Sequence, residues 1–341
     1  MFSRLLLTGL LGLSSVFASP VASNSTALES RADSSLVGYF FVHFYDREPS
    51  IFAHLSNGND PLSYFALNGD RAILKPTVGT KGARDPYLIS RPDQSKHWII
   101  ATDLDIAAIG NNWGTAVTKG SRSLLVWEST DLVNWSASRL ASVMPATAGM
   151  VWAPEAVWDS SKNAFMVHWA SRTYAASDTA HTGAASLDQI WYSHTTDFAT
   201  FTTPAKYIAG SIPVIDLTFL FVSGSTYIRF VKDENRLRIY QERSTTGLFG
   251  TWSKIGGDIA STVTEGPLTF WDNAVANRAY VFADEYGGDT TSRGYVPFVS
   301  NNVSGGSWSR ASLTNFPKLT KHGVVKPVTQ AQYNLIKAKW P

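Results

Sequence analysis

Residues 84–90, R-D-P-Y-L-I-S, place an acidic residue and a proline directly before an apolar run with the composition of a buried strand. Three later stretches also carry an acidic residue at or near the start of an apolar strand: WAPEAVWD (152–159), VIDLTFLF (214–221) and EGPLTFWD (265–272). A single Asp-Pro pair indicates only a turn. Four such strands, recurring at intervals of about 50–70 residues, indicate a repeated structural unit.

Further strand-like segments complete each unit. The second strands all end in polar residues: GYFFVHFYD (38–46), HWIIATDLD (97–105), AFMVHWASR (164–172), TYIRFVKDE (226–234) and RAYVFADEY (278–286). The unit at the N-terminus lacks a leading strand, which KHGVVKP (321–327) can supply from the far end of the chain. Five units of about four strands predict an all-β fold, a five-bladed β-propeller whose last blade is closed by strands from both termini. A pair of β-sandwiches is the alternative, and the only helix expected is the tail Gln330–Trp340.

Composition and the N-terminus set the class of protein. The 341 residues are 44% hydrophobic, with 12 Trp, 13 Tyr and no Cys, which favours a large β-rich core without disulfides. The net charge of +2 and the lack of a basic run argue against a nucleic-acid partner. Residues 1–22 are expected to be a secretory signal peptide, 23–36 a leader or disordered tail, and 37–341 a single catalytic domain. We therefore expect a secreted, extracellular monomer with no membrane partner.

The propeller geometry brings distant acidic residues together. In this fold the first strand of each blade lines the central channel, and all first strands start at the same face. The residues expected at that face are Asp85, Glu155, Asp216, Glu265 and His322. Clustered carboxylates raise one another's pKa, a cost usually retained where catalysis or a metal requires it. A polar funnel rimmed by Trp113, Trp152 and Arg293 suits a sugar, whose hydroxyls need donors and acceptors and whose face stacks on an aromatic ring.

The motifs D-P (85–86), W-A-P-E (152–155), I-D (215–216) and E-G-P (265–267), in that order, resemble glycoside hydrolase family 43. Members of that family are five-bladed propeller enzymes that release arabinofuranose, xylose or related sugars from plant polysaccharides. The resemblance covers about residues 38–340 of the chain. It implies that Asp85 is the general base that activates water, that Glu265 is the general acid, and that Asp216 raises the pKa of Glu265.

The resemblance also suggests roles around these carboxylates. Trp152, Glu155 and Arg293 are expected to bind the substrate, an oligosaccharide or polysaccharide. His322 resembles a channel histidine that some family members place beside a bound calcium ion or water cluster, and a hydrogen-bonded core residue is the alternative interpretation. No cofactor is expected to be required. The sequence leaves open whether a structural calcium ion occupies the channel.

Two carboxylates that flank a glycosidic bond can hydrolyse it, and their separation decides the stereochemical outcome. Acids on non-adjacent blades leave room for a water molecule, which predicts an inverting mechanism. We expect a glycosidase that removes terminal sugars, first of all α-L-arabinofuranose, from plant cell-wall polysaccharides. A β-xylosidase, a galactofuranosidase and a non-catalytic sugar-binding propeller are the alternatives. A lectin would repeat one binding constellation in each blade, whereas the first-strand motifs here differ between blades.

Overall fold

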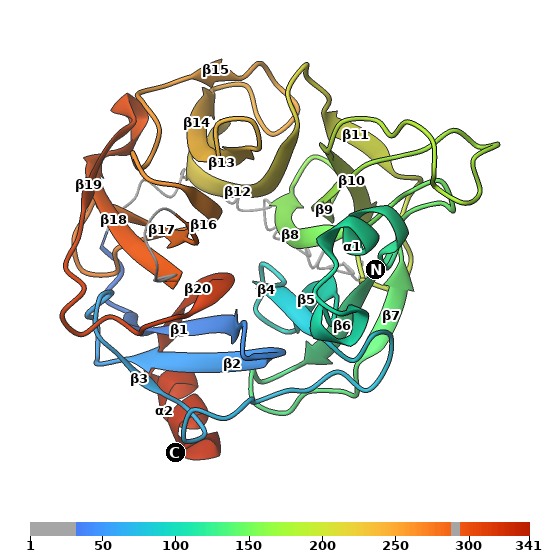
Figure 1. The fold of residues 1–341 in the computed structure, drawn as a ribbon. Coiled ribbons are helices and arrows are strands. Elements are labelled where there is room, and N and C mark those ends of the chain that lie inside the picture. The colour runs from blue at the N-terminus through green and yellow to red at the C-terminus, as the bar shows by residue number, and fades with distance from the viewer. Residues whose placement is uncertain (1–31, 288–293) are drawn as a thin grey trace, which may run out of the picture.

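The computed structural model describes residues 32–287 and 294–341. Within these ranges, twenty strands form five four-stranded antiparallel sheets around a central channel (Figure 1). The predicted five-bladed β-propeller is confirmed. The predicted signal peptide, residues 23–31 of the predicted leader and Arg293 lie outside the described residues.

Four blades are built from consecutive segments of the chain, and each begins at the channel and ends at the periphery. Blade 1 contains β4 (Ala83–Ser90), β5 (His97–Asp103), β6 (Ser123–Ser129) and β7 (Arg139–Ser142). Blade 2 contains β8 (Trp152–Asp159), β9 (Ala164–Ser171), β10 (Gln189–Thr195) and β11 (Ala205–Ile208). Blade 3 contains β12 (Val214–Ser223), β13 (Thr226–Asp233), β14 (Arg238–Ser244) and β15 (Ser253–Lys254). Blade 4 contains β16 (Thr264–Trp271), β17 (Ala279–Glu285), β18 (Gly294–Asn302) and β19 (Ser307–Arg310).

Blade 5 joins the two ends of the chain, as predicted. Its strands, from the channel outwards, are β20 (Lys321–Thr329), β1 (Leu36–Tyr45), β2 (Glu48–Ser56) and β3 (Tyr64–Ala66). The antiparallel pairing of β20 with β1 joins the two ends of the chain in one blade and closes the ring. The C-terminal helix α2 (Gln330–Lys339) starts at a capping box formed by Thr329 and Gln332.

A second helix was not predicted. The short α1 (Trp113–Lys119) lies in the connection between β5 and β6, and its N-cap is Asn112, whose side chain accepts a hydrogen bond from the N–H of Thr115. Short 3₁₀ turns occupy Ala107–Ile109 and Val303–Gly305. No helix of the described chain is both long and apolar enough to cross a membrane.

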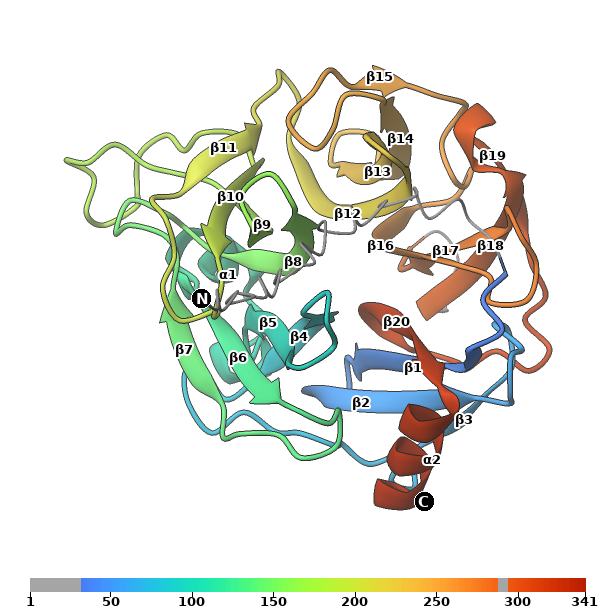
Figure 2. The same cartoon turned by 180° about the vertical axis from the view of Figure 1, so that it is seen from behind.

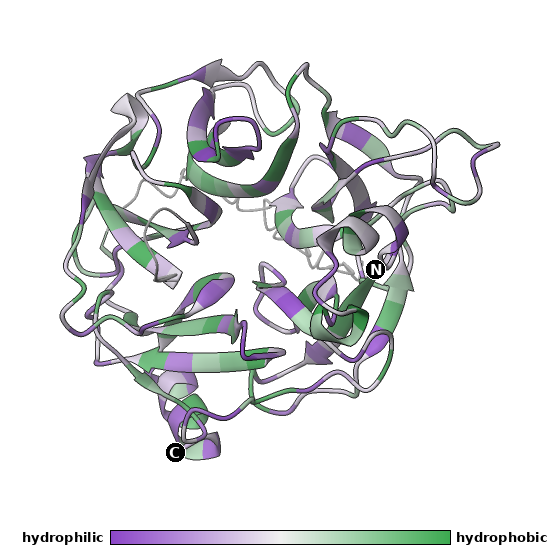
Figure 3. Ribbon diagram, viewed as in Figure 1, coloured by the Kyte–Doolittle hydropathy of each residue, from purple (hydrophilic) through white to green (hydrophobic). Residues whose placement is uncertain are grey.

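The hydrophobic core is divided among the interfaces between blades. Between blades 1 and 2, for example, Trp98 and Phe165 pack edge to face with their ring centroids 5.5 Å apart, and Phe198 joins both. Figure 3 shows hydrophobic segments along the strands of every blade. Because the blades are held together through these interfaces, polar residues can occupy the ends of the first strands at the channel mouth.

The same irregularity interrupts the first strand of every blade. One extra residue shifts the register at Asp85–Pro86, Ala153–Pro154, Asp216, Gly266–Pro267 and His322. We call these five positions the entry bulges; the strands that carry them, β4, β8, β12, β16 and β20, surround the channel (Figure 2). Four of the bulges have left-handed backbone, with φ of 50° at Asp85, 46° at Ala153, 51° at Asp216 and 52° at Gly266. β-Bulges bend a strand and re-aim its side chains, here at the channel mouth.

Candidate active site

A cavity of about 640 Å³ opens over the channel mouth and is lined by residues from all five blades. The entry bulges supply Asp85, Ala153, Asp216 and His322, and the residues just before the bulges supply Arg84, Trp152, Ile215, Glu265 and Lys321. The polar ends of the second strands, which the sequence placed at the rim, contribute Asp46, Arg172, Glu234 and Asp284. The cavity thus contains all three predicted catalytic carboxylates.

Glu155 does not reach this cavity. It directly follows the blade 2 bulge at Ala153–Pro154 and lines a smaller cavity of about 20 Å³ deeper in the channel. The sequence pattern suggested one ring of four acids, but the bulge places residues before and after it at different depths. Burial there raises the pKa of Glu155 well above its ordinary value, against a hydrogen bond with Thr218 that lowers it.

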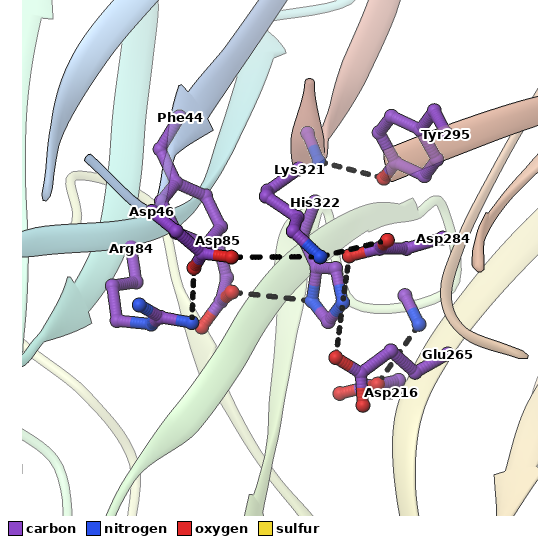
Figure 4. Close-up of polar contacts among 12 residues, drawn as sticks. Phe44, Asp46, Arg84, Asp85, Asp216, Glu265, Asp284, Tyr295, Lys321 and His322 are labelled. Carbon is purple, nitrogen blue, oxygen red and sulfur yellow. Dashed lines mark hydrogen bonds and ion pairs between the residues drawn. The ribbon is translucent and has the colours of Figure 1, made fainter. Parts of the chain in front are cut away.

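His322 lies at the centre of the carboxylates (Figure 4). Its Nδ1 is 3.1 Å from Asp85 Oδ1, and its Nε2 is 3.4 Å from Glu265 Oε1 and 3.6 Å from Asp284 Oδ2. Burial alone would lower the pKa of His322, but the surrounding carboxylates raise it well above the ordinary value. His322 is therefore an imidazolium that links acids from blades 1 and 4.

Asp85 is held in the form that a general base requires. Its Oδ2 accepts a hydrogen bond from the Thr102 hydroxyl at 2.8 Å, and its Oδ1 faces His322. Burial would raise the pKa of Asp85, but His322, the Arg84 charge and the Thr102 hydroxyl together lower it below the usual range. The Asp85 carboxylate is thus ionised at neutral pH.

Glu265 is paired with a second buried cation. Lys232 Nζ is 2.8 Å from Glu265 Oε2 and 2.7 Å from Glu234 Oε1. Burial opposes ionisation of Glu265, yet the contacts with His322 and Lys232 lower its pKa below the ordinary value. In this arrangement the two cations outweigh the effect expected from Asp216.

Asp216 itself has the raised pKa. Its Oδ2 accepts a hydrogen bond from the Gly266 N–H at 2.9 Å, which ties the blade 3 bulge to the blade 4 bulge. Burial raises the pKa of Asp216 to about 6, and the neighbouring Glu265 and Asp85 charges act in the same direction. The role of Asp216 as a modulator of Glu265 stays a prediction.

Asp284 is a central residue that the sequence pattern placed only at the rim. It is almost fully buried, and its Oδ1 accepts a hydrogen bond from Lys321 Nζ at 3.1 Å. Burial raises the pKa of Asp284 to about 6 despite that ion pair. Asp284 lies in F-A-D-E-Y, near the end of a second-strand segment. This position could have marked it as a site residue, but it does not distinguish Asp284 from Glu285.

Arg84 had no assigned role and is paired at the rim. Its guanidinium is 3.2 Å from Asp46 Oδ1 and lies over the rings of Phe44, at 4.5 Å, and Trp113, at 5.4 Å. Trp113 is 49% exposed and meets Trp152 edge to face, with 6.0 Å between ring centroids. The two predicted tryptophans therefore form an aromatic wall on the blade 1 and blade 2 side of the cavity.

Three of these residues have the spacing of metal ligands. Asp216, Glu265 and His322 each offer one ligand atom, and the atoms lie within 4.8 Å of one another. Calcium prefers six to eight oxygen ligands. Here His322 contacts Asp85 and Glu265 directly and the Lys232 ammonium contacts Glu265, so cations of the protein already neutralise the carboxylates. This donor set does not fit a resident calcium ion.

A protein family and a curated protein are similar to this chain in sequence. Residues 34–334 match the model of a glycosyl hydrolase 43-related family, described as a probable glycosyl hydrolase domain. A curated α-L-arabinofuranosidase of Bifidobacterium longum subsp. longum is 34% identical over 188 residues, which make up 52% of this chain and 17% of that protein. The chain thus spans less than a fifth of the length of this curated relative.

The solved structures that resemble this chain have low sequence identity to it. An exo-β-1,3-galactanase from Phanerochaete chrysosporium with galactose has a TM-score of 0.51 at 13% identity and covers 72% of this chain and 53% of that one. A thermostable family-43 glycoside hydrolase has a TM-score of 0.48 at 17% identity, with coverage of 70% and 75%.

The described residues form a propeller with an asymmetric, carboxylate-rich cavity at its channel mouth, an arrangement suited to hydrolysis of a glycosidic bond. The match over residues 34–334 makes the assignment specific: the chain belongs to the glycosyl hydrolase 43-related family, which confirms the resemblance of the four motifs to glycoside hydrolase family 43.

Proposed function

We propose that the protein is a secreted, inverting glycosidase that removes terminal α-L-arabinofuranose from plant cell-wall polysaccharides. The observation that carries this proposal is the placement of Asp85 and Glu265, from non-adjacent blades, on opposite nitrogens of the His322 ring in one cavity. The curated relative named as an α-L-arabinofuranosidase supports the choice of sugar. No step requires a metal or an organic cofactor.

In the proposed reaction Asp85 accepts a proton from a water molecule as that water attacks the anomeric carbon. The bond from this carbon to the leaving oxygen breaks, and Glu265 donates a proton to that oxygen. The lowered pKa of Asp85 suits a base that must be ionised at neutral pH. Inverting pairs are separated by about 6.5–9.5 Å, which leaves space for the water, and the imidazole ring between Asp85 and Glu265 is consistent with such a gap.

Glu265 needs a proton to act as the acid, and Lys232 is positioned to control whether it has one. Lys232 contacts both Glu265 and Glu234. We propose that substrate binding shifts Lys232 towards Glu234, after which burial and the nearby Asp216 raise the pKa of Glu265. Glu234 lines the cavity and is more exposed than Lys232, so its side chain can follow the ammonium outward.

The sugar is tested with nitrophenyl α-L-arabinofuranoside, β-xyloside and β-galactofuranoside. We expect the arabinofuranoside to be cleaved with the highest kcat/KM. A preference for one of the other two glycosides would select the β-xylosidase or galactofuranosidase alternative. Binding without cleavage of any of the three would favour the sugar-binding propeller.

The acid role of Glu265 is tested with leaving groups of different pKa. A dinitrophenolate leaves without protonation, so Glu265→Gln is expected to cleave a dinitrophenyl glycoside nearly as well as wild type but to lose about 10²–10⁴-fold on an oligosaccharide. Asp93→Asn, at an exposed turn of blade 1, is the control. Equal losses of Glu265→Gln on both substrates would contradict the assignment.

A further inference from the structure

A second cavity, of about 290 Å³, lies beside the active-site cavity and has a different chemistry. It is lined by Lys119, Gly120, Arg122, Ala148, Thr179, Ala180 and His181. Three of these seven residues are basic and none is acidic. We call it the basic cleft.

The two long cations of the basic cleft are not neutralised by the protein. Within the described chain, neither Lys119 nor Arg122 forms an ion pair with a carboxylate. Arg122 donates one hydrogen bond from Nη1 to the carbonyl oxygen of Ala146 at 3.1 Å, which fixes one end of its guanidinium. The remaining N–H groups of Arg122 and the Lys119 ammonium are available to an anionic ligand.

His181 holds the wall of the cleft through its two ring nitrogens. Its Nδ1 is 2.7 Å from the carbonyl oxygen of Thr118, and its Nε2 is 3.0 Å from that of Ala146. Carbonyl oxygens only accept, so both contacts are hydrogen bonds when the ring carries two protons. The ring also stacks on Tyr174, with 4.2 Å between centroids and 7° between planes. The β9–β10 connection, from which His181 comes, is thereby fastened to the end of α1.

Asp178, an acidic residue of the same connection, is held by backbone N–H groups. Asp178 accepts hydrogen bonds from the backbone N–H groups of Thr182 and Gly183, at 3.1 and 2.8 Å, and it does not line the cleft. The cleft is thus a built cationic recess between the α1 segment of blade 1 and the β9–β10 connection of blade 2.

Helix α1 separates the basic cleft from the active-site cavity. Trp113, Gly114 and Val117 line the active-site cavity, whereas Lys119 and Gly120 line the basic cleft. At about 1.5 Å of rise per residue, the two ends of this seven-residue helix are about 9 Å apart. A short oligosaccharide can therefore extend from one cavity to the other.

We propose that the basic cleft binds the carboxylate of an acidic sugar in the polysaccharide, a uronic acid unit of the chain from which the terminal sugar is removed. This inference rests on the proposed function, because it treats the cleft as a subsite of the same substrate. Lys119 and Arg122 pair with the carboxylate, and His181 positions the cleft against α1. The enzyme would then prefer side chains on an acidic main chain over those on a neutral one.

Binding is tested by calorimetry with tetragalacturonate and its fully methyl-esterified form, which has the same length and no charge. Wild type is expected to bind the acid form at least tenfold more tightly. Lys119→Ala/Arg122→Ala is expected to bind the two forms equally. The control Arg91→Ala/Lys162→Ala removes two positive charges from turns at the opposite face and is expected to keep the wild-type preference.

Three outcomes would overturn the proposal: equal binding of both forms by wild type, the same loss in the control, or equally tight binding of inorganic phosphate, which would indicate a small-anion site. Hydrolysis of nitrophenyl arabinofuranoside separates this result from the proposed function. The compound lacks a uronate, so Lys119→Ala/Arg122→Ala is expected to retain wild-type kcat/KM on it. Absence of this hydrolysis in wild type would contradict the arabinofuranosidase proposal and leave the binding experiment valid.

Discussion

The entry bulges of blade 1 and blade 2 have nearly the same backbone and different chemistry. Asp85 and Ala153 both have left-handed φ, 50° and 46°, and both precede a proline. They also share Thr102, whose hydroxyl donates to Asp85 Oδ2 and accepts from the Ala153 N–H, each at 2.8 Å. One bulge presents a carboxylate to the cavity and the other a methyl group.

This comparison separates what belongs to the fold from what belongs to the reaction. A left-handed conformation costs an L-residue about 1–2 kcal/mol, and strained backbone of this kind is often taken as a mark of catalysis. Here the bulge also occurs at Ala153, which has no catalytic group. The strained backbone is therefore a property of each blade, and function enters through the side chain placed on it.

The largest effect is expected when blade 1 is made to resemble blade 2. Asp85→Ala leaves a residue whose backbone conformation the equivalent position already accommodates, so the variant should fold, although loss of the pair with His322 costs about 3–5 kcal/mol. The proposed general base is lost, so kcat should fall about 10²–10⁴-fold. Kinetics on nitrophenyl arabinofuranoside together with thermal unfolding test this. A kcat close to that of wild type in the folded variant would contradict the role of Asp85 as the base.

The blade 4 bulge differs because it cannot accept a side chain. A Cβ on Gly266 would lie 2.1 Å from His322 Cδ2. Gly266→Ala should displace the imidazolium from Glu265, reduce kcat about tenfold to a hundredfold and cost about 1–3 kcal/mol of stability. The matched variant Ala153→Gly, at the bulge without a catalytic group, should change both quantities little. Wild-type activity in Gly266→Ala would show that the position of His322 is unimportant.

The Thr102 hydroxyl connects the blade 1 and blade 2 bulges through two hydrogen bonds, and substitution of Thr102 tests this connection. Thr102→Val keeps the shape but leaves the Ala153 N–H without its partner, which should cost about 1–3 kcal/mol. Loss of the hydrogen bond to Asp85 raises the pKa of that carboxyl, so the acidic limb of the kcat/KM profile should move to higher pH. The control Thr269→Val removes a hydroxyl bond to the Tyr280 carbonyl in blade 4 and should leave the profile unchanged. An unshifted profile in Thr102→Val would contradict the link.

The repeat was readable from the sequence because each blade contains apolar strands that end in polar residues, and the X-Pro pairs marked three of the five bulges. The depth of each acidic side chain in the channel could not be predicted from the sequence. Glu155 and Glu265 both stand near the start of a first strand, but one follows its bulge and the other precedes it. A sequence pattern with a period of two residues does not show where a bulge inserts an extra one.

The ion pairs that neutralise the carboxylates of the site also could not be predicted from the sequence. Lys232 comes from the second strand of blade 3, within the apolar run Y-I-R-F-V-K, where a lysine is expected at a solvated position. In the fold it is almost fully buried between two carboxylates of different segments. Glu234 is two residues from Lys232, whereas Glu265 comes from the first strand of the next blade, and these contacts decide which carboxylate holds a proton.

The smallest predicted effect concerns His168, a buried histidine outside the active site, which we compare with His322 inside it. His168 is buried in β9 against Phe219, and neither ring nitrogen has a hydrogen-bond partner in the described chain. Burial lowers the pKa of His168 to about 3, whereas the unfolded chain binds this proton near pH 6.5. The contribution of His168 to stability is therefore complete above about pH 6.5 and falls by about 1.4 kcal/mol per pH unit below it.

His168→Phe should reduce the acid sensitivity of unfolding, and the free energies of unfolding of variant and wild type at pH 7 and pH 5 measure this.

For His322 the pH dependence of stability has the opposite sign, because its pKa is raised in the folded protein. Its contribution to stability is present below pH 6.5 and is lost as the pH rises through its folded-state pKa. His322→Gln should thus weaken the protein most at acidic pH. The same pH dependence in both variants would show that the carboxylates do not hold His322 as a cation.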